Sequence, residues 1–554
     1  MMRFLPVNLN ALLVELDNLE QTLALLASLK NEPIAGIEEL VPAARTILVQ
    51  WRPSACSLAE LVRQISQRDV SARAERSGTL IEIPVHYTGD DLMEVAELLG
   101  ITPEEVIRRH TDSEYTVAFT GFAPGFAYLS GGHPSFNVPR RSTPRTRIPA
   151  GAVGLAGTFS AVYPQASPGG WQIIGVTPTV MWDLSRDVPA LLQPGYRVRF
   201  IDIATISIAA CASSTGARGL KDLIPLSPQA ASPFLGDTAL EILSPGLQTL
   251  FQDLGRPGQA GQGVSASGAM DQAALKASNR LVGNTSNSAA LETASGGLRL
   301  RSHGDTVVAV TGADAPLTVT SANGRHWPAA RYQPFALTEG DTLSIGQPQA
   351  GLRTYLAVRG GFAVAPVLGS CATDTLAQVG PKPLAASDVL PIQGVRHGAA
   401  VGLPEEAPMD LPTLQDVVTL DVVLGPRTDW FTPESLERLS SQRWQVTPQS
   451  NRIGLRLAGE VALARAVPDE LPSEGTPWGA IQVPPSGQPV LFLADHPLTG
   501  GYPVIGCVAT YHLDRAGQIP INAWVRFNPI RDFEPLTTVA RDSAAPHKTD
   551  RETA

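Results

Sequence analysis

The chain has 554 residues, of which 43% are hydrophobic, and its formal net charge of -10 corresponds to a pI near 5.5. A chain of this length is too long for one hydrophobic core, so we expect several domains. The acidic balance provides no general field that would attract nucleic acid or an anionic membrane, so we expect neither as a partner.

The four cysteines are scattered and form no Cys-x-x-Cys pair, which indicates a reducing compartment. The first twenty residues lack a basic leader followed by an apolar run, and no window has the eighteen uninterrupted apolar residues of a membrane span. We therefore expect a soluble cytoplasmic protein. The nine histidines show no i, i+4 pairing, so no metal site is expected.

Glycine and proline, at 50 and 47 residues, are spread evenly along the chain, which is typical of many short strands and turns. We predict a mainly β fold. The segment 1–87 differs, because helical patterns at 18–30 and 58–69 alternate with apolar runs at 46–51 and 79–87. This alternation predicts a small two-layer α/β domain, with Ser57 capping the second helix.

Two further helices open the next predicted domain, 88–210. The first ends at Gly100, and the second starts at Thr102 with Pro103 at its first position and Glu105 three residues on, a capping-box arrangement. Strand-like runs follow. We predict a β-barrel.

The segment 211–236 is rich in Ser, Pro, Ala and Gly without a sustained period, which predicts a linker. Beyond it we predict two β-barrel domains, 237–412 and 413–535, the second with a helix from Pro433 capped by Thr432. The end of the chain, 536–554, has no apolar period and is predicted to be disordered.

One internal repeat joins the two parts of the chain. The octet PGGWQIIG at 168–175 matches TGGYPVIG at 499–506, and each follows a proline-glycine turn. The spacing to that turn differs between the copies. We infer that two of the domains share a fold.

The stretch from Gly121 to Gly175 combines many glycines and prolines with three arginines, Arg140, Arg141 and Arg145. Ordering so many glycines is costly, which suggests that the backbone lies near a ligand or partner. A guanidinium presents a planar fork of donors suited to carboxylate or phosphate. The three arginines form either an anion clamp or a set of salt bridges.

Paired glycines at 169–170 and 500–501 either let backbone N–H groups approach an oxyanion or form tight turns. Asp495 and His496 precede the second pair and are the predicted catalytic residues, for acid–base work. A structural aspartate at a strand end is the alternative. The predicted substrate-binding residues are Arg140, Arg141, Arg145, Gly169, Gly170, Trp171, Arg452, Gly500, Gly501 and Tyr502.

Two sets of motifs extend over nearly the whole chain outside the linker and tail. GFAPGFAYL, PRRSTPRTRIPAGAVGLAG and YPQASPGGWQIIGVTP resemble the B component of 5-oxoprolinase, also described as allophanate hydrolase subunit 1. SPGLQTLFQDLGRPGQAGQGVSASGAMD, SNRIGLRLAG and ADHPLTGGYP resemble its partner, the C component. The chain looks like a B–C fusion, in which the B half precedes the linker and the C half follows it. The same pair corresponds to the carboxyltransferase domain of urea carboxylase.

The resemblance implies a small α/β N-terminal domain followed by three cyclophilin-like β-barrel units. It also implies a function. With a separate protein, the A component of 5-oxoprolinase, such proteins open the lactam of 5-oxoproline to glutamate, using ATP as co-substrate; phosphorylation of the amide oxygen makes attack by water feasible. The sequence does not locate the ATP site, and we expect the chain to be inactive alone.

Two other functions stay open. The first is the carboxyltransferase component of a urea or amide carboxylase; none of the six methionines precedes a lysine, so a biotin carrier protein would have to be a separate partner. The second is a non-enzymatic regulator that binds a sensor histidine kinase, as in Kip proteins. Fusion of both halves in one chain favours a catalytic assembly.

Overall fold

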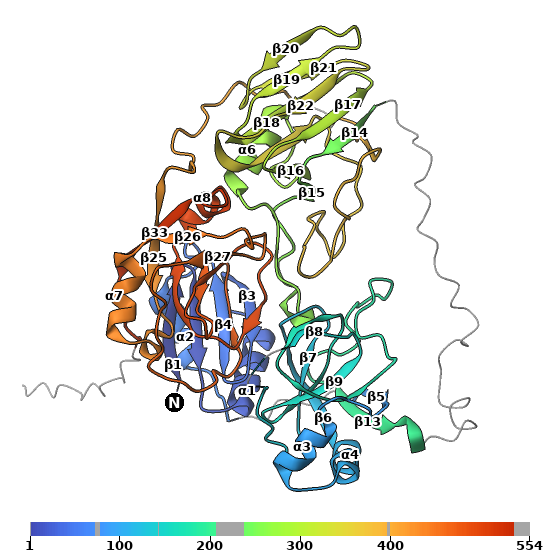
Figure 1. Ribbon diagram of the computed structural model, residues 1–554, viewed down its shortest axis with the longest axis vertical. Coiled ribbons are helices and arrows are strands. Elements are labelled where there is room, and N and C mark those ends of the chain that lie inside the picture. Colours follow the sequence, from blue (N-terminus) through green and yellow to red (C-terminus); the bar gives the residue numbers. More distant parts are fainter. Residues whose placement is uncertain are drawn as a thin grey trace, which may run out of the picture.

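The computed structural model describes residues 2–71, 78–141, 143, 145–205, 238–395 and 399–536. Four units make up these residues, and each contains β-sheet (Figure 1). The predicted mainly β class with a small α/β unit at the N-terminus is confirmed. The predicted linker and all but the first residue of the predicted tail lie outside the described residues.

The N-terminal unit is a four-stranded sheet, in the order β1-β2-β4-β3, with two helices. Asn18 and Ser57 cap these helices by accepting hydrogen bonds from backbone N–H groups of their first turns, as such side chains do. The elements are β1 (Arg3–Asn8), β2 (Ala11–Glu15), α1 (Leu19–Asn31), β3 (Ile37–Pro42), β4 (Thr46–Trp51) and α2 (Leu58–Ser66).

The second unit is a nearly closed seven-stranded sheet, in the order β12-β9-β10-β7-β6-β13-β5, whose ends meet where His86 bridges Val176. Its elements are β5 (Leu80–Val85), α3 (Leu92–Leu99), α4 (Pro103–Thr111), β6 (Glu114–Thr120), β7 (Ala127–Ser130), β9 (Ala152–Ala156), β10 (Phe159–Val162), β12 (Gln172–Val176) and β13 (Arg197–Asp202). A two-stranded sheet of β8 (Arg145–Ile148) and β11 (Ser167–Gly169) lies beside it.

Strand β5 corrects one predicted boundary. We assigned residues 79–87 to the N-terminal domain, whereas β5 pairs in parallel with β13 in the second unit. A parallel pair has no local turn that would mark it in the sequence.

The third unit consists of two sheets packed around a common apolar core, one of six strands and one of five. The six-stranded sheet contains β20 (His326–Ala329), β19 (Leu317–Thr320), β22 (Thr342–Ile345), β17 (Leu298–His303), β14 (Ala239–Pro245) and β24 (Val389–Pro391). The other contains β15 (Gln248–Gln252), β16 (Ala290–Ala294), β23 (Ala350–Val358), β18 (Thr306–Asp314) and β21 (Pro334–Leu337), with α6 (Gln272–Val282) against it.

The final unit is a closed barrel, in the order β25-β32-β29-β30-β27-β26-β33. Its strands are β25 (Val417–Leu424), β26 (Trp444–Val446), β27 (Gly454–Ala458), β29 (Ala480–Gln482), β30 (Val490–Phe492), β32 (Val504–Val508) and β33 (Trp524–Arg531). The helices are α7 (Pro433–Ser441), capped by Thr432, and α8 (Leu513–Gly517). A separate pair joins β28 (Glu474–Gly475) to β31 (Thr499–Gly500).

The second and final units share a pattern that agrees with the sequence repeat. In each, the first and last strands pair in parallel, β5 with β13 and β25 with β33. In each, the Gly-Gly pair of the octet lies in or beside a small two-stranded sheet. The rest of the octet enters a barrel strand.

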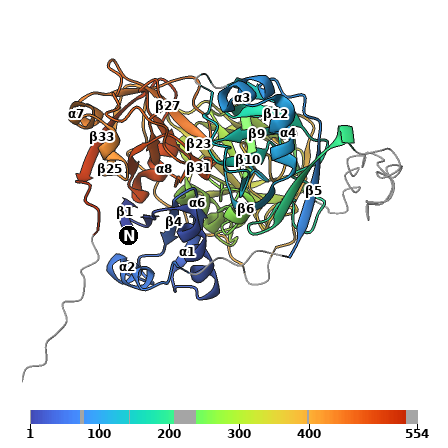
Figure 2. The same cartoon turned by 90° about the horizontal axis from the view of Figure 1, so that it is seen from below.

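The first and last units of the described chain are in contact. The N-terminal unit packs against the final barrel, and both views show them side by side (Figures 1 and 2). Asn8 Nδ2 donates to the Val508 carbonyl at 2.9 Å, and Phe4 bridges Leu536. No helix in the described part of the chain is long and apolar enough to cross a membrane.

Candidate functional site at the junction of the halves

Four loops from three units meet between the two halves of the chain. We call this place the junction site and define it by residues 121–126, 260–268, 374–377 and 495–501. Hydrogen bonds join the loops: Phe122 N donates to Thr499 Oγ1 at 3.1 Å, and Gly125 N donates to the Gln262 carbonyl at 2.9 Å. The first loop belongs to the B half and the others to the C half.

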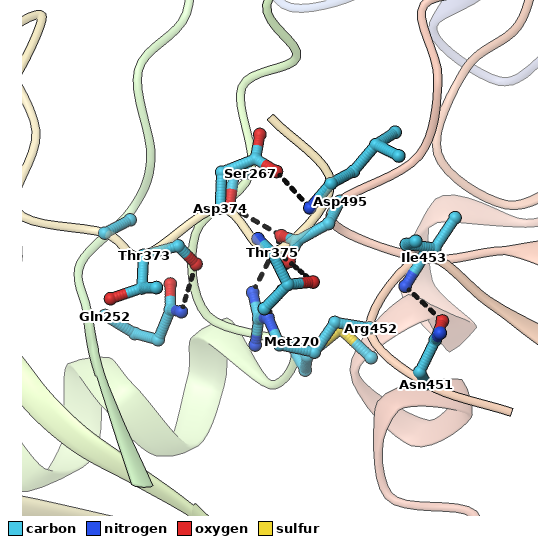
Figure 3. Close-up of polar contacts among 12 residues, drawn as sticks. Gln252, Ser267, Met270, Thr373, Asp374, Thr375, Asn451, Arg452, Ile453 and Asp495 are labelled. Carbon is cyan, nitrogen blue, oxygen red and sulfur yellow. Dashed lines mark hydrogen bonds and ion pairs between the residues drawn. The ribbon is translucent and has the colours of Figure 1, made fainter. Parts of the chain in front are cut away.

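Asp495 lies fully buried in this site, surrounded by donors (Figure 3). One carboxylate oxygen accepts from Ser267 Oγ at 2.6 Å, and the other from both N and Oγ1 of Thr375 at 2.8 and 2.7 Å. Arg452 adds a two-pronged contact through Nε and Nη2, at 3.0 and 3.1 Å. With its oxygens occupied, Asp495 is suited to positioning its neighbours rather than to exchanging protons.

Arg452 is likewise buried and holds the C half together. Its remaining N–H groups donate to Glu292, from the third unit, and to the Gly268 carbonyl. Burial alone would lower the pKa of Arg452, but Asp495 and Glu292 raise it. Arg452 therefore keeps its charge. In turn it holds the pKa of Asp495 below the ordinary value despite burial.

A second carboxyl in the site, Asp374, has a raised pKa, whereas that of Asp495 is lowered. Asp374 is buried and accepts from Leu376 N, Ala377 N and Ser265 Oγ, but no cation forms an ion pair with it among the described residues. Burial, and then the neighbouring Asp495, raise its pKa to about 7. Two adjacent carboxyls with pKa values moved apart are typical of acid–base sites.

Arg256 is a buried cation whose hydrogen bonding is incomplete. Its Nη2 donates to the Ala372 carbonyl, but Nε and Nη1 have no partner in the described structure. Burial lowers its pKa, while Asp374, Asp253 and Asp495 favour its charge. Unpaired buried donors are costly, so these two N–H groups are available for an anionic atom.

His496 has the geometry of a base. Its Nδ1 lies 3.0 Å from the Pro497 carbonyl, which requires the proton on Nδ1 and leaves the lone pair on Nε2. Nε2 has no hydrogen-bond partner among the described residues. Burial lowers the pKa of His496, so the imidazole stays neutral near pH 7.

Two non-glycine residues of the site have left-handed backbone conformations, Phe122 with φ 64° and Ser267 with φ 55°. Such conformations are uncommon outside glycine and cluster at functional sites. Ser267 lies in the sequence GVSASG, which nearly matches a nucleophile elbow, but its hydroxyl donates to Asp495.

The predicted arginine clamp divides into two parts. Arg145 makes two contacts of 2.7 Å with Asp91, and Arg141 contacts Asp91 at 2.6 Å and Glu94 at 3.3 Å, so both cations already have acid partners. Asp91 is buried at the start of α3, and sequence spacing gave no sign of this pairing. For Arg141 and Arg145 the salt-bridge alternative describes the structure.

Arg140 lies elsewhere, beside the second glycine pair. A Cβ atom added to Gly501 would lie 2.6 Å from Arg140 Nη1, and the nearest acid, Glu470, is 3.8 Å from Arg140 Nε. The structure therefore brings Arg140 to the segment 495–501. Asp495, at the other end of that segment, faces the third unit.

The other predicted binding residues have varied surroundings. Trp171 is buried among aromatic rings, with Phe126 and Tyr128 edge-on to it. Gly169 packs on Tyr163, and the Gly170 carbonyl accepts from Arg141 N. Gly500 lies against Gln482, and the Arg465 guanidinium stands 5.6 Å from the Tyr502 ring.

Sequence reasoning missed Asp374, Arg256 and Glu292. Arg256 stands next to a proline in DLGRPG, as Arg140 and Arg145 do in VPRRSTPRT, and that similarity was a usable signal. Asp374 and Glu292 lie in ordinary contexts, CATDTLA and ALETA. Only the folded chain brings them to Asp495 and Arg452.

A nearly closed barrel, a pair of packed sheets and a closed barrel thus meet at the junction site. The family described as "Carboxyltransferase domain, subdomain C and D" matches residues 2–192, and the one described as "Carboxyltransferase domain, subdomain A and B" matches residues 262–529. The chain belongs to this carboxyltransferase-domain family, and it has a fused B–C architecture.

Each half has its own relatives. Residues of the C half are 34% identical to the C component of 5-oxoprolinase from Escherichia coli over 294 residues, 52% of this chain and 90% of the relative. The B half is 38% identical to the B component of 5-oxoprolinase from Bacillus subtilis over 198 residues, 32% of this chain and 80% of the relative.

The chain is also 35% identical to urea amidolyase of Saccharomyces cerevisiae over 311 residues, which is 53% of this chain but only 17% of that protein. Among solved structures, that of a protein called TTHA0988 matches with a TM-score of 0.76 and 32% identity, covering 94% of this chain and 99% of the other. The relatives belong to enzyme systems, which supports a role as an enzyme component.

Proposed function

We propose that the chain is the B–C component of an ATP-dependent 5-oxoprolinase, which opens 5-oxoproline to glutamate together with a separate A-component protein. One observation carries the proposal: the two halves of one chain are similar, each over at least 80% of the relative's length, to the B and C components of 5-oxoprolinase. ATP enters as co-substrate of the complex, and we assign its binding to no residue of this chain.

Within this proposal the junction site holds the substrate between the halves. Arg140 and the turn at Gly500–Gly501 would bind the carboxylate of 5-oxoproline, because a guanidinium without a close acid partner is suited to that group. His496 Nε2 would accept a proton from the attacking water. Asp495 and Arg452 would act as positioning residues, because every oxygen of Asp495 is already bonded.

A second function has support of its own. The similarity to yeast urea amidolyase and the carboxyltransferase family description favour a component that accepts CO2 from a biotin on another polypeptide. The acceptor would be urea or another amide. The same neutral imidazole would then remove a proton from the amide nitrogen.

Reconstitution separates the two functions. The purified chain is mixed with an A-component protein, ATP and 5-oxoproline, and glutamate is measured; the chain alone serves as the baseline. In parallel it is mixed with a carboxybiotin carrier and urea, and carboxylation is measured. We expect glutamate only from the first mixture. Carboxylated urea without glutamate would establish the second function.

A further inference from the structure

A charged cavity of about 200 Å³ lies between the N-terminal unit and the final barrel, and neither Asp495 nor His496 lines it. Its ionic lining comes from both ends of the chain. The N-terminal unit contributes Arg3, Glu15 and Arg45, and the final unit contributes Arg427, Asp429 and Glu474. Neither the sequence motifs nor the proposed function uses this cavity.

The inner wall is a closed ionic network. Arg427 donates to Glu15 at 2.7 Å through Nη2 and to Glu474 at 3.0 Å through Nε, and all three side chains are less than 10% exposed. Arg3 takes the second oxygen of Glu15 at 2.6 Å. The two glutamates are therefore occupied by cations and have little capacity left for a ligand.

Donors are left over on the side of the N-terminal unit. Arg45 is half exposed, and its one described ion pair, to Glu15, is long at 3.6 Å. Thr46 lines the cavity and is buried, yet its hydroxyl has no hydrogen-bond partner in the described structure. A buried hydroxyl without a partner costs free energy that a ligand would recover.

An acceptor is left over on the opposite side. Asp429 lies in a 3-10 turn, Thr428–Trp430, and no cation or N–H group among the described residues contacts its carboxylate. The cavity thus offers a half-exposed guanidinium with one long ion pair from one unit and an exposed carboxylate from the other. Its six ionic groups, three arginines and three acids, sum to zero formal charge.

We propose that this cavity binds a small zwitterion, a free α-amino acid, with its carboxylate on Arg45 and Thr46 and its ammonium group on Asp429. A net-neutral ligand with separated charges can contact Arg45 and the exposed Asp429 together without changing the charge balance of the wall, whereas a simple anion can contact only the cation. The volume is below the roughly 300–1,000 Å³ of pockets for drug-sized ligands, which suits a molecule as small as an amino acid.

The test measures binding to the full chain by calorimetry, using L-alanine and L-glutamine as probes. Propionate and ethylamine serve as matched analogues of L-alanine, each lacking one charged group. We expect L-alanine to bind at least about tenfold more tightly than either analogue, because each lost charged contact removes roughly 1.5–3 kcal/mol.

Single substitutions show which side chain binds the carboxylate of the ligand and which binds its ammonium group. Arg45→Ala should weaken L-alanine and propionate about tenfold, and Asp429→Asn should weaken L-alanine but not propionate. Thr46→Val removes only the unpartnered hydroxyl and should weaken L-alanine without lowering the unfolding midpoint. Arg52→Ala, on an exposed ion pair with Glu38, is the control and should change nothing.

Three results would overturn the proposal. The first is the absence of binding by both amino acids, and the second is binding that Arg45→Ala leaves unchanged. The third is propionate or inorganic phosphate binding as tightly as L-alanine, which would make the cavity a simple anion site. None of these results depends on 5-oxoproline hydrolysis.

Discussion

At the scale of single residues, Asp495 and His496 are neighbours in the junction site but differ in their hydrogen bonding. Asp495 has five donors on its two oxygens, whereas the Nε2 atom of His496 has none among the described residues. A carboxylate so fully bonded is a weak base, and a neutral imidazole with a free lone pair is a good one. Within the proposed function, Asp495 would therefore position its neighbours and His496 would transfer the proton.

The pH dependence of the reconstituted reaction tests His496. Burial lowers the pKa of His496 below the ordinary 6.5. The active neutral form therefore persists until the pH falls through this lowered pKa. We expect kcat/KM to fall on the acid side of pH 6.5, and His496→Asn to lower it at least about 100-fold and remove that limb. The exposed His326→Asn is the control; an unchanged profile in His496→Asn would contradict the role.

Asp495 should matter for stability. Asp495→Asn leaves the buried Arg452 with Glu292 as its one described acid partner and should lower the free energy of unfolding by about 3–5 kcal/mol. The double variant Asp495→Asn, Arg452→Met should recover part of this loss, because no unpaired charge remains. Chemical denaturation measures both. A single variant as stable as the wild type would show that the pair contributes nothing.

At the scale of elements, Asp91 fixes helix α3 to strands β8 and β12. It binds Arg145 and Arg141 and accepts from Ile173 N at 2.7 Å. Burial alone would raise its pKa, but Arg145, Ile173 N and Arg141 lower it. The contact therefore stabilises the fold above the ordinary pKa of 3.8, and that stabilisation is lost as the pH falls through the lowered value.

Asp91→Asn should lower the free energy of unfolding at pH 7 by about 2 kcal/mol, since it removes charge-assisted hydrogen bonds. The difference from wild type should shrink in acid below pH 3.8. Asp90→Asn is the matched control, because Asp90 is 84% exposed and 3.8 Å from Arg145, and it should change stability by less than about 0.5 kcal/mol. Equal effects of the two substitutions would contradict the assignment.

Local signals in the sequence predicted several of these structural elements. The caps at Ser57, Thr102 and Thr432 hold where expected, because a cap depends on residues a few positions apart. The octet repeat pointed to the fold shared by the second and final units. The strand β5 was assigned to the wrong unit, and the partners of Asp495 were missed, because both depend on contacts between distant residues.

At the scale of the whole molecule, the N-terminal unit docks on the C half, as the loop 121–126 of the second unit also does. Arg427 binds Glu15 across this interface, and Glu39 accepts from Gly258 N at 2.6 Å. Asn8 adds a bond to Val508. These contacts lie outside the linker region, so the halves have their own interface.

Residues 1–205 and 238–554 expressed as separate chains should therefore form a one-to-one complex. Arg427→Met leaves Glu15 and Glu474 without their shared cation and should weaken this complex about 100-fold. Arg280→Met removes a pair within the C half and is the control. Analytical ultracentrifugation measures the affinity, and halves that stay apart would contradict the interface.

The most direct test of the proposed function is glutamate release from 5-oxoproline by the wild-type chain combined with an A-component protein and ATP. We predict release that requires both proteins, requires ATP and is lost in His496→Asn while the variant remains folded. Folded wild-type protein that forms the complex but releases no glutamate would contradict the proposal.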